Sequence, residues 1–312
     1  MGKTAFVFPG QGAQYVGMGR DFYETYPVSR EMFDRASAVT GLDLPALCFE
    51  KNDRLDVTEY TQIAMLTVEA AILAAVRERG ILPDVTAGLS LGEYGALIAS
   101  GVLSSEDAFR VVRKRGNYMQ SEVPSGGAMA AVIGMDSEKI EEICEKTEGI
   151  VSIANYNCPG QIVITGEEKA VMEAGEALKM EGARRIIQLK VSGPFHSEML
   201  KGAGEKLGKV LDQVSIHDIQ VPYLSNVTAD YVTDREQIPS ILMRQVFSPV
   251  RWQQSVERML ADGTDIFLEI GPGKTLTGFL RKINRGAAGI NIETAEDLEK
   301  AAETLENRSR IC

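Results

Sequence analysis

The pentapeptide at residues 88–92, Gly-Leu-Ser-Leu-Gly, places one serine between two glycines. An apolar run at residues 85–87 precedes it and is typical of a buried strand, and residues 93–99 indicate the opening of a helix. A strand, G-x-S-x-G and a helix form the context in which a sharp turn holds a serine outward as a nucleophile. The chemistry predicted for Ser90 is attack on an acyl group, with the backbone N–H of Leu91 facing the oxyanion. A glycine-rich turn with an incidental serine is the alternative, because so short a pattern also recurs by accident.

A serine nucleophile needs a base, and the chain has only two histidines, His196 and His217. His196 directly follows a Gly-Pro-Phe turn at residues 193–195, on a loop, where a general base is commonly placed. His217 lies in a polar connector, which favours an exposed position. Alone, His196 would be interpreted as a structural histidine; together with Ser90 it is the predicted base. Two histidines also make a His-rich metal site hard to build, so no metal is predicted.

A helix predicted over residues 104–120 begins at a good N-cap, Ser104, and carries an arginine on its apolar side. The apolar stripe consists of Ala108, Val111, Val112 and Met119. At about 100° per residue, Arg115 falls in the middle of that stripe. A core-facing arginine is costly unless it meets an anion. Two interpretations stay open: a structural arginine with an acidic partner or an outward-reaching stem, and a binding site for an anionic substrate.

The first predicted strand, residues 4–8, ends at the loop Gly10-Gln11-Gly12. A dinucleotide-binding fingerprint would need a third glycine at position 15, where Tyr15 stands, so that class is excluded. Such a loop can instead bring a backbone N–H, that of Gln11, beside the elbow as a second oxyanion donor. A plain turn is the alternative.

Length and composition set the class of protein. The 312 residues suggest one large domain or two unequal ones, and 44% hydrophobic residues allow a substantial core. No signal peptide and no apolar run of about 18 residues is found, so we expect no membrane span. Four scattered cysteines without C-x-x-C spacing indicate reduced thiols and a cytoplasmic protein. A net charge of −11 argues against nucleic acid as a partner, although a site can be locally basic.

Residues 124–193 form a compact block between Ser90 and His196. Strands are predicted at 128–134, 150–154, 161–165 and 184–191, with helices at 136–148 and 167–181. That order, β-α-β-β-α-β, is the ferredoxin-like arrangement. We therefore predict a small domain inserted into a larger one made of residues 1–123 and 194–312. The later elements predicted are a helix from about 198, a strand at 221–227, helices at 238–246 and 252–261, a strand at 266–270, and helices at 274–283 and 294–307.

Taken together, several motifs occur in the order and spacing of one known family. They are the loop 10–12, the pentapeptide 88–92, Arg115, the Asn155/Asn157 hairpin, Phe195-His196 and the turn 269–273. Over nearly its whole length the chain resembles the malonyl-CoA:acyl carrier protein transacylases. The resemblance implies an α/β fold, with an α/β-hydrolase-like core and a ferredoxin-like insert. It also implies transfer of the malonyl group from malonyl-CoA to the phosphopantetheine thiol of acyl carrier protein, for fatty acid synthesis, by a monomer without a cofactor.

The resemblance assigns roles to single residues. It makes Ser90 the acylated nucleophile and His196 its base, in a ping-pong mechanism. Gln11 and Leu91 would supply oxyanion N–H groups, and Arg115 would bind the free malonyl carboxylate.

Four further residues line or support the site in the family pattern. Gln245 would orient His196 through its main-chain carbonyl, and Asn155 would bind substrate. Phe195 would wall the acyl pocket and favour malonyl over methylmalonyl groups. Leu89 is a departure, because many members have histidine there; we expect an altered pocket wall rather than lost chemistry.

The carrier protein of this family is acidic, so a protein of charge −11 needs a local basic patch to bind it. The candidates are Arg184, Arg185, Lys190, Arg281, Lys282 and Arg285.

Two other functions stay open. A serine hydrolase of the α/β-hydrolase type usually has the order serine, acid, histidine, with the histidine near the C-terminus. The long segment after His196 and the insert before it disfavour that class. A non-catalytic module that binds the carrier would never acquire an acyl group.

Overall fold

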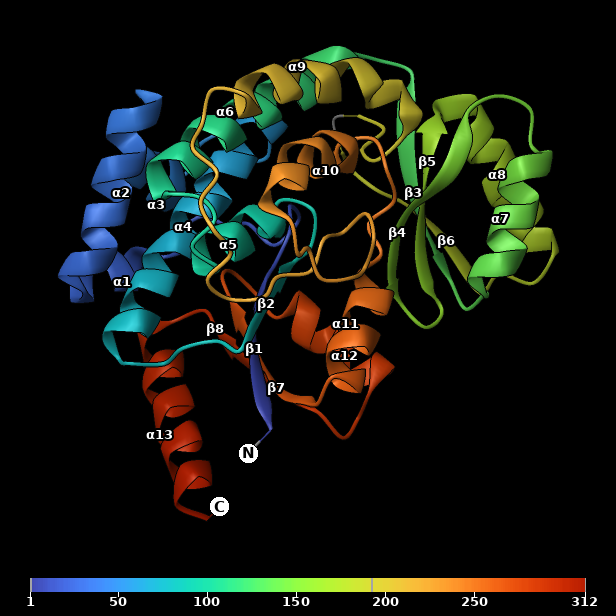
Figure 1. The fold of residues 1–312 in the computed structure, drawn as a ribbon. Helices are drawn as coiled ribbons and strands as arrows, with labels where there is room; N and C mark the ends of the chain where they lie inside the picture. Colours follow the sequence, from blue (N-terminus) through green and yellow to red (C-terminus); the bar gives the residue numbers. More distant parts are fainter. Residues whose placement is uncertain (1, 192, 312) are drawn as a thin grey trace.

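The computed structural model describes residues 2–191 and 193–311, and its centre is a parallel sheet. The strands are β1 (Lys3–Phe8), β2 (Val85–Gly88), β7 (Thr264–Ile270) and β8 (Ala288–Ile292). Their order is β2-β1-β7-β8, and every pairing is parallel (Figure 1). Parallel strands need crossovers, so helices cover both faces of the sheet, and most residues of its central strands β1 and β7 are buried.

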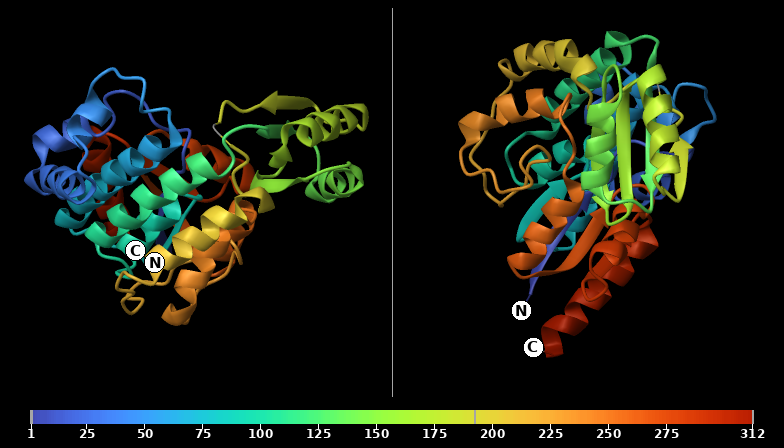
Figure 2. Two further views of the ribbon diagram at one scale, coloured as in Figure 1. Left: turned by 90° about the horizontal axis from the view of Figure 1, so that it is seen from above. Right: turned by 90° about the vertical axis from the view of Figure 1, so that its right-hand side faces the viewer.

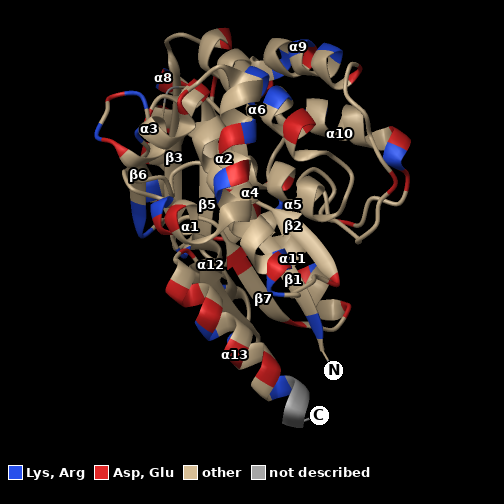
Figure 3. Ribbon diagram, turned by 90° about the vertical axis from the view of Figure 1, so that its left-hand side faces the viewer, with Lys and Arg blue, Asp and Glu red and all other residues tan. Residues whose placement is uncertain are grey.

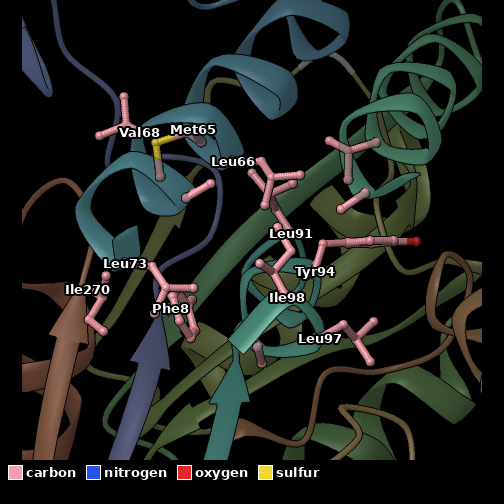
Figure 4. Close-up of a cluster of buried hydrophobic side chains, with 14 of the residues drawn as sticks. Phe8, Met65, Leu66, Val68, Leu73, Leu91, Tyr94, Leu97, Ile98 and Ile270 are labelled. Carbon is pink, nitrogen blue, oxygen red and sulfur yellow. The ribbon is translucent and has the colours of Figure 1, made fainter. Parts of the chain in front are cut away.

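Strand β1 shows this two-sided burial directly. Phe6 and Phe8 belong to one hydrophobic cluster, and Ala5 and Val7 belong to another, because successive side chains point to opposite faces. Figure 4 shows the first cluster, in which side chains of helices α4 (Thr58–Glu78) and α5 (Gly92–Ala99) gather above the strands. The second cluster packs under helices α11 (Trp252–Ala261) and α12 (Thr275–Ile283).

The remaining helices surround this core. They are α1 (Arg20–Thr25), α2 (Pro27–Thr40), α3 (Leu44–Phe49), α6 (Ser105–Glu122), α9 (Lys201–Leu211), α10 (Ile238–Gln245) and α13 (Ala295–Ile311), with 3-10 turns at Glu198–Leu200 and Arg235–Gln237. Helix α6 begins at Ser104, whose side chain accepts a hydrogen bond from the Asp107 N–H at 3.0 Å. Figure 3 shows charges of both signs along α13.

A second sheet is antiparallel, with the order β4-β5-β3-β6. Its strands are β3 (Gly127–Ile133), β4 (Val151–Cys158), β5 (Gln161–Glu167) and β6 (Arg185–Gln188), and helices α7 (Ser137–Lys146) and α8 (Glu168–Met180) complete the unit. Both helices lie on one side of this sheet, which projects from the rest of the molecule (Figures 1 and 2). Its apolar residues on the side of α7 and α8 form a cluster of their own, whereas Met129, Ala131, Ala154 and Val163 join the large cluster. The predicted β-α-β-β-α-β order of elements therefore matches the structure.

Main-chain hydrogen bonds tie the small sheet to the rest of the molecule. The Tyr156 N–H donates to the Val250 carbonyl at 2.9 Å, and the Val250 N–H donates to the Ala154 carbonyl at 2.8 Å. Strand β4 is thus fastened to the segment between α10 and α11, just before the start of α11.

The structure corrects one predicted strand and adds a strand that was not predicted. Residues 221–227 do not form a strand, because only Tyr223 and Leu224 make isolated bridges. Pro222 has no N–H for a ladder, and the chain then turns away. Strand β8 was not predicted; it has only five residues, mostly half-buried, so its pattern is weak.

Helix α4 is long and apolar enough to cross a membrane by length and composition alone, although Glu69 interrupts its apolar run. In the structure, 83% of its apolar window is buried, as expected for the core helix of a folded domain.

Candidate active site

The turn between β2 and α5 requires both of its glycines. A Cβ on Gly88 would lie 1.9 Å from the Gly92 carbonyl oxygen, and a Cβ on Gly92 would lie 2.1 Å from the Phe8 carbonyl oxygen. Ser90 between them has a φ of 56°, a left-handed conformation that costs a non-glycine residue free energy. The sequence thus folds here into the sharp, strained turn expected of a nucleophile elbow.

The strained turn is held by Asn226, which sequence reasoning missed. Its Oδ1 accepts a hydrogen bond from the Ser90 N–H at 2.6 Å, and its Nδ2 donates to the Gly88 carbonyl at 2.6 Å. Asn226 is 1% exposed, so these bonds form away from water.

His196 lies directly against the serine. Its Nε2 is 2.7 Å from Ser90 Oγ, and its Nδ1 lies 2.8 Å from the Gln245 carbonyl oxygen and 3.1 Å from the Ser248 carbonyl oxygen. Carbonyl oxygens only accept hydrogen bonds, so we assign the ring proton to Nδ1. Nε2 then has a free lone pair facing the Ser90 hydroxyl. The orienting groups are carbonyls, whereas a Ser-His-Asp triad uses a carboxylate.

The surroundings keep this histidine neutral. Burial and the nearby Arg115 charge lower the pKa of His196 to about 4. The hydrogen bonds to the two carbonyls raise it, but they offset only part of this shift. An unprotonated imidazole is the form that can accept a proton.

Arg115 is 1% exposed, as the apolar stripe predicts. Its Nη1 donates to Gln62 Oε1 at 2.7 Å, and its Nη2 lies 2.9 Å from Gln245 Oε1 and 3.2 Å from Ser90 Oγ. Burial lowers the pKa of Arg115, and within the described ranges its Nε has no hydrogen-bond partner and the guanidinium makes no ion pair. A buried cation that lies over the Tyr94 ring and donates hydrogen bonds only to neutral oxygens is suited to an incoming anion.

The Ser90 hydroxyl opens into a cavity of about 480 Å³ between the two sheets. Besides Ser90, its lining includes Gln11, Leu89, Leu91, Arg115, Asn155, Asn157, Gln161, Lys190, Phe195, His196 and Phe279. Every predicted catalytic, oxyanion and substrate-binding residue therefore borders one space. Gln245 lies behind it, where its carbonyl contacts His196 and its side chain contacts Arg115.

The two predicted oxyanion donors, Gln11 and Leu91, border the same cavity as Ser90, on the loop after β1 and at the start of α5. Among the residues that the structure describes, neither the Gln11 nor the Leu91 backbone N–H has a recorded acceptor. The Gln11 side chain donates to Thr58 Oγ1 at 3.2 Å, which helps to hold its loop.

The predicted basic residues are all exposed: Arg184, Arg185, Lys190, Arg281, Lys282 and Arg285. The Lys282 ammonium donates to Gln161 Oε1 at 2.9 Å, and Gln161 and Arg185 pair with the same residue of β3 from opposite sides. Lys282 and Arg185 therefore lie at one end of the small sheet. Lys190 lies beyond the other end of β6, where it borders the cavity.

Sequence reasoning also missed Gln62 and Glu93, although both are in contact with the site. Gln62 holds Arg115, and the Glu93 carboxylate accepts a hydrogen bond from Gln245 Nε2 at 2.9 Å. The only signal in the sequence for Gln62 and Glu93 was a polar side chain on the apolar side of a helix, as for Arg115. In the part of the chain that the structure describes, no cluster of three His, Cys, Asp or Glu side chains is arranged to hold a metal ion.

Comparisons with known proteins show the family of this chain. The model of the acyl transferase domain family matches residues 5–302. The malonyl CoA-acyl carrier protein transacylase of Bacillus subtilis (strain 168) is 48% identical over 99% of this chain and 99% of its own length. The enzyme of that name from Staphylococcus aureus (strain MRSA252) is 43% identical, over 96% of this chain and 98% of its own.

Solved structures give the same result. The malonyl CoA-acyl carrier protein transacylase from Clostridium perfringens superposes with a TM-score of 0.96 at 44% identity, covering 99% of each chain. A malonyl-transacylase in complex with a type II PKS acyl-carrier protein superposes with a TM-score of 0.94 at 40% identity, covering 97% of this chain and 99% of that one.

Proposed function

This chain belongs to the acyl transferase family, among the malonyl CoA-acyl carrier protein transacylases, and on that basis we propose the reaction that it catalyses. It moves the malonyl group from malonyl-CoA to the phosphopantetheine thiol of an acyl carrier protein and so supplies extender units for fatty acid synthesis. The observation that carries this proposal is that the Ser90 hydroxyl contacts both a neutral imidazole and a guanidinium. Ser90 Oγ lies 2.7 Å from the His196 Nε2 and 3.2 Å from the Arg115 guanidinium.

In the first half-reaction, His196 Nε2 takes the proton of the Ser90 hydroxyl as its oxygen attacks the thioester carbonyl. The negative charge that develops on the carbonyl oxygen is stabilised by the backbone N–H groups of Gln11 and Leu91. When the C–S bond breaks, the imidazolium returns its proton to the leaving CoA sulfur. The products are a malonyl ester on Ser90 and free CoA.

In the second half-reaction, the carrier's phosphopantetheine thiol occupies the place that CoA has left. His196 takes the thiol proton while the sulfur attacks the ester carbonyl. The C–O bond to Ser90 then breaks, and the serine oxygen recovers a proton from the imidazolium. No cofactor enters either step.

Arg115 recognises the acyl group in this proposal. The free carboxylate of a malonyl ester lies only two carbons from the ester carbonyl and is within reach of a guanidinium beside Ser90 Oγ. A planar guanidinium can donate two parallel hydrogen bonds to a carboxylate. Phe195, which is 7% exposed and borders the same cavity, would crowd a branched acyl group such as methylmalonyl.

The finer fold description is part of the proposal. We infer an α/β-hydrolase-like core, residues 1–123 and 194–312, and a ferredoxin-like insert, residues 124–193. The separate parallel and antiparallel sheets support this division, as does the cluster that the small sheet forms with its own two helices. The cavity between the sheets supports a cleft at the joints.

The acyl carrier protein is proposed to dock over the basic residues at one end of the small sheet, including Arg184, Arg185, Lys282 and Arg285. All four are exposed, and charge complementarity would guide an acidic partner to them. We also propose that the protein works as a cytoplasmic monomer.

The remaining alternatives are separated by one experiment. The protein is incubated with radiolabelled malonyl-CoA, with and without holo acyl carrier protein, and free malonate and malonyl-carrier are counted. The proposal predicts label on the carrier in amounts that far exceed free malonate. Free malonate as the main product would indicate a hydrolase, and no label on either product would indicate a non-catalytic binding module.

A further inference from the structure

A buried carboxyl group beneath the nucleophile turn has no part in the reaction described above. Glu93 lies in the first turn of α5 and is 0% exposed. One of its oxygens, Oε2, accepts two hydrogen bonds, from Gln245 Nε2 at 2.9 Å and from the Asn226 N–H at 3.2 Å. Its other oxygen, Oε1, has no partner in the described ranges. A group buried this deeply and bonded through a single oxygen calls for an explanation.

Its first donor, Gln245, also contacts the serine and the arginine. Gln245 Nε2 donates to the Ser90 carbonyl oxygen at 2.7 Å as well as to Glu93, and Gln245 Oε1 accepts from Arg115 Nη2 at 2.9 Å. An amide has a donor end and an acceptor end. Because Glu93 and the Ser90 carbonyl both attract the donor end, the acceptor end is directed at Arg115.

The direction of the amide matters for Arg115. A reversed Gln245 amide would place an NH₂ group against the guanidinium, donor against donor, and the guanidinium would move away. Misplacement of a binding group by about 1 Å can cost about 10²-fold in rate. The bond from Glu93 therefore bears on the position of the cation that lies 3.2 Å from Ser90 Oγ.

We propose that Glu93 is a positioning residue that sets the preference for malonyl over acetyl groups, by holding the Gln245 amide with its oxygen toward Arg115. This inference rests on the proposed function. The contact of Glu93 with the Asn226 main chain supports the Ser90 turn and acts on every acyl group alike. The part of the effect that passes through Gln245 and Arg115 to the acyl carboxylate acts on malonyl groups alone, because an acetyl group has no carboxylate.

The acceptor oxygen of Glu93 matters in this account, and its charge does not. Burial raises the pKa of Glu93 to about 7, so the carboxylate is not strongly favoured near neutral pH. Glutamine at this position can keep an acceptor oxygen at the place of Oε2. Aspartate keeps a carboxyl group but withdraws it by one methylene from both donors.

The test compares Glu93→Gln with Glu93→Asp. For each variant, the acylation rate from malonyl-CoA and from acetyl-CoA is measured by quenched flow and mass spectrometry, and the ratio of the two rates is taken. We expect Glu93→Asp to lower the malonyl:acetyl ratio about 10- to 100-fold. Glu93→Gln should restore the ratio to within about threefold of the unmodified protein.

The matched control is Glu69→Gln. Glu69 is another fully buried glutamate that packs against α5, but neither of its carboxyl oxygens has a hydrogen-bond partner among the described residues. Its replacement should leave the ratio unchanged.

An unchanged ratio in Glu93→Asp, or an equal fall in Glu93→Gln, would overturn the inference. If Glu93→Asp does not fold, the malonyl:acetyl ratio of Glu93→Met is measured instead, because methionine removes the acceptor oxygen without burying a charge. An unmodified protein that does not prefer malonyl to acetyl groups would instead refute the proposed function.

Discussion

The two walls of the cavity are built differently. We call Ser90, His196 and Arg115, with Gln245 behind them, the catalytic wall, and Asn155 and Asn157 on β4 the small-sheet wall. In the catalytic wall, each polar side chain is held by at least one hydrogen bond. In the small-sheet wall, neither asparagine side chain has a hydrogen bond to another described residue, and each is 8% exposed.

This difference separates chemistry from binding. Pre-arranged groups need no reorganisation when charge develops, which suits the wall that carries the nucleophile. Free amide groups can pair with whatever polar groups a substrate brings. The pantetheine arm shared by CoA and the carrier is rich in amides, so we infer that the small-sheet wall binds that arm.

The largest effect is expected from His196→Ala. Removal of a general base costs about 10²- to 10⁴-fold, so acylation by malonyl-CoA should slow by that factor, measured by quenched-flow mass spectrometry. His217→Ala, the only other histidine variant, is the control and should be near neutral. Equal losses in both variants would remove His196 from the mechanism.

The same residue predicts a pH profile. Because the pKa of His196 is lowered to about 4, the neutral base persists as pH falls through its ordinary value of 6.5. The acid limb of kcat/KM for malonyl-CoA should therefore lie nearer pH 4 than pH 6.5, over the range in which circular dichroism shows a folded protein. A limb centred at pH 6.5 would contradict the burial argument.

A second large effect, selective rather than general, is expected from Arg115→Ala. Removing one partner of a desolvated charge pair costs roughly 2–5 kcal/mol, so malonyl transfer should fall steeply while acetyl transfer is kept or rises. Arg115→Lys should recover little, because an ammonium lacks the planar pair of donors. Equal losses of malonyl and acetyl transfer would make Arg115 structural.

A smaller effect is expected on the opposite wall. Asn155→Ala and Asn157→Ala should each cost about 0.5–1.5 kcal/mol, seen as a higher KM for malonyl-CoA with kcat little changed. Asn117→Ala, on α6 outside the cavity lining, is the matched control. A fall in kcat with an unchanged KM in the Asn155 and Asn157 variants would contradict the assignment of binding to the small-sheet wall and chemistry to the catalytic wall.

The smallest effect is expected at the proposed docking surface. Lys282→Glu should raise the KM for the carrier and leave malonyl-CoA acylation unchanged, and the effect should shrink at high salt. Lys300→Glu, on α13, is the control for charge alone. Equal carrier kinetics for the two variants would place the docking surface elsewhere.

The sequence predicted the parts of the site whose signal is local. Ser90 follows from its glycines and flanking elements, and Arg115 from the periodicity of its own helix. The helices predicted over 104–120 and 167–181 lie within two residues of the observed bounds, and Trp252–Ala261 has the predicted bounds. Helix α2 was not predicted.

What the sequence did not show depends on contacts between distant segments. Asn226 meets Ser90 across 136 positions, and Glu93 meets Gln245 across 152. No periodicity or motif encodes such a pair, because each residue alone has the pattern of an ordinary polar residue. The role of Gln245 came only from the family resemblance.

The central claim is that Ser90 becomes malonylated, and peptide mapping tests it most directly. The protein is mixed with malonyl-CoA, quenched in acid, digested and analysed by mass spectrometry. We predict a malonyl group on the peptide that contains Ser90, its loss after holo acyl carrier protein is added, and no adduct in Ser90→Ala. A malonyl group on another residue, or an adduct that persists in Ser90→Ala, would contradict the account.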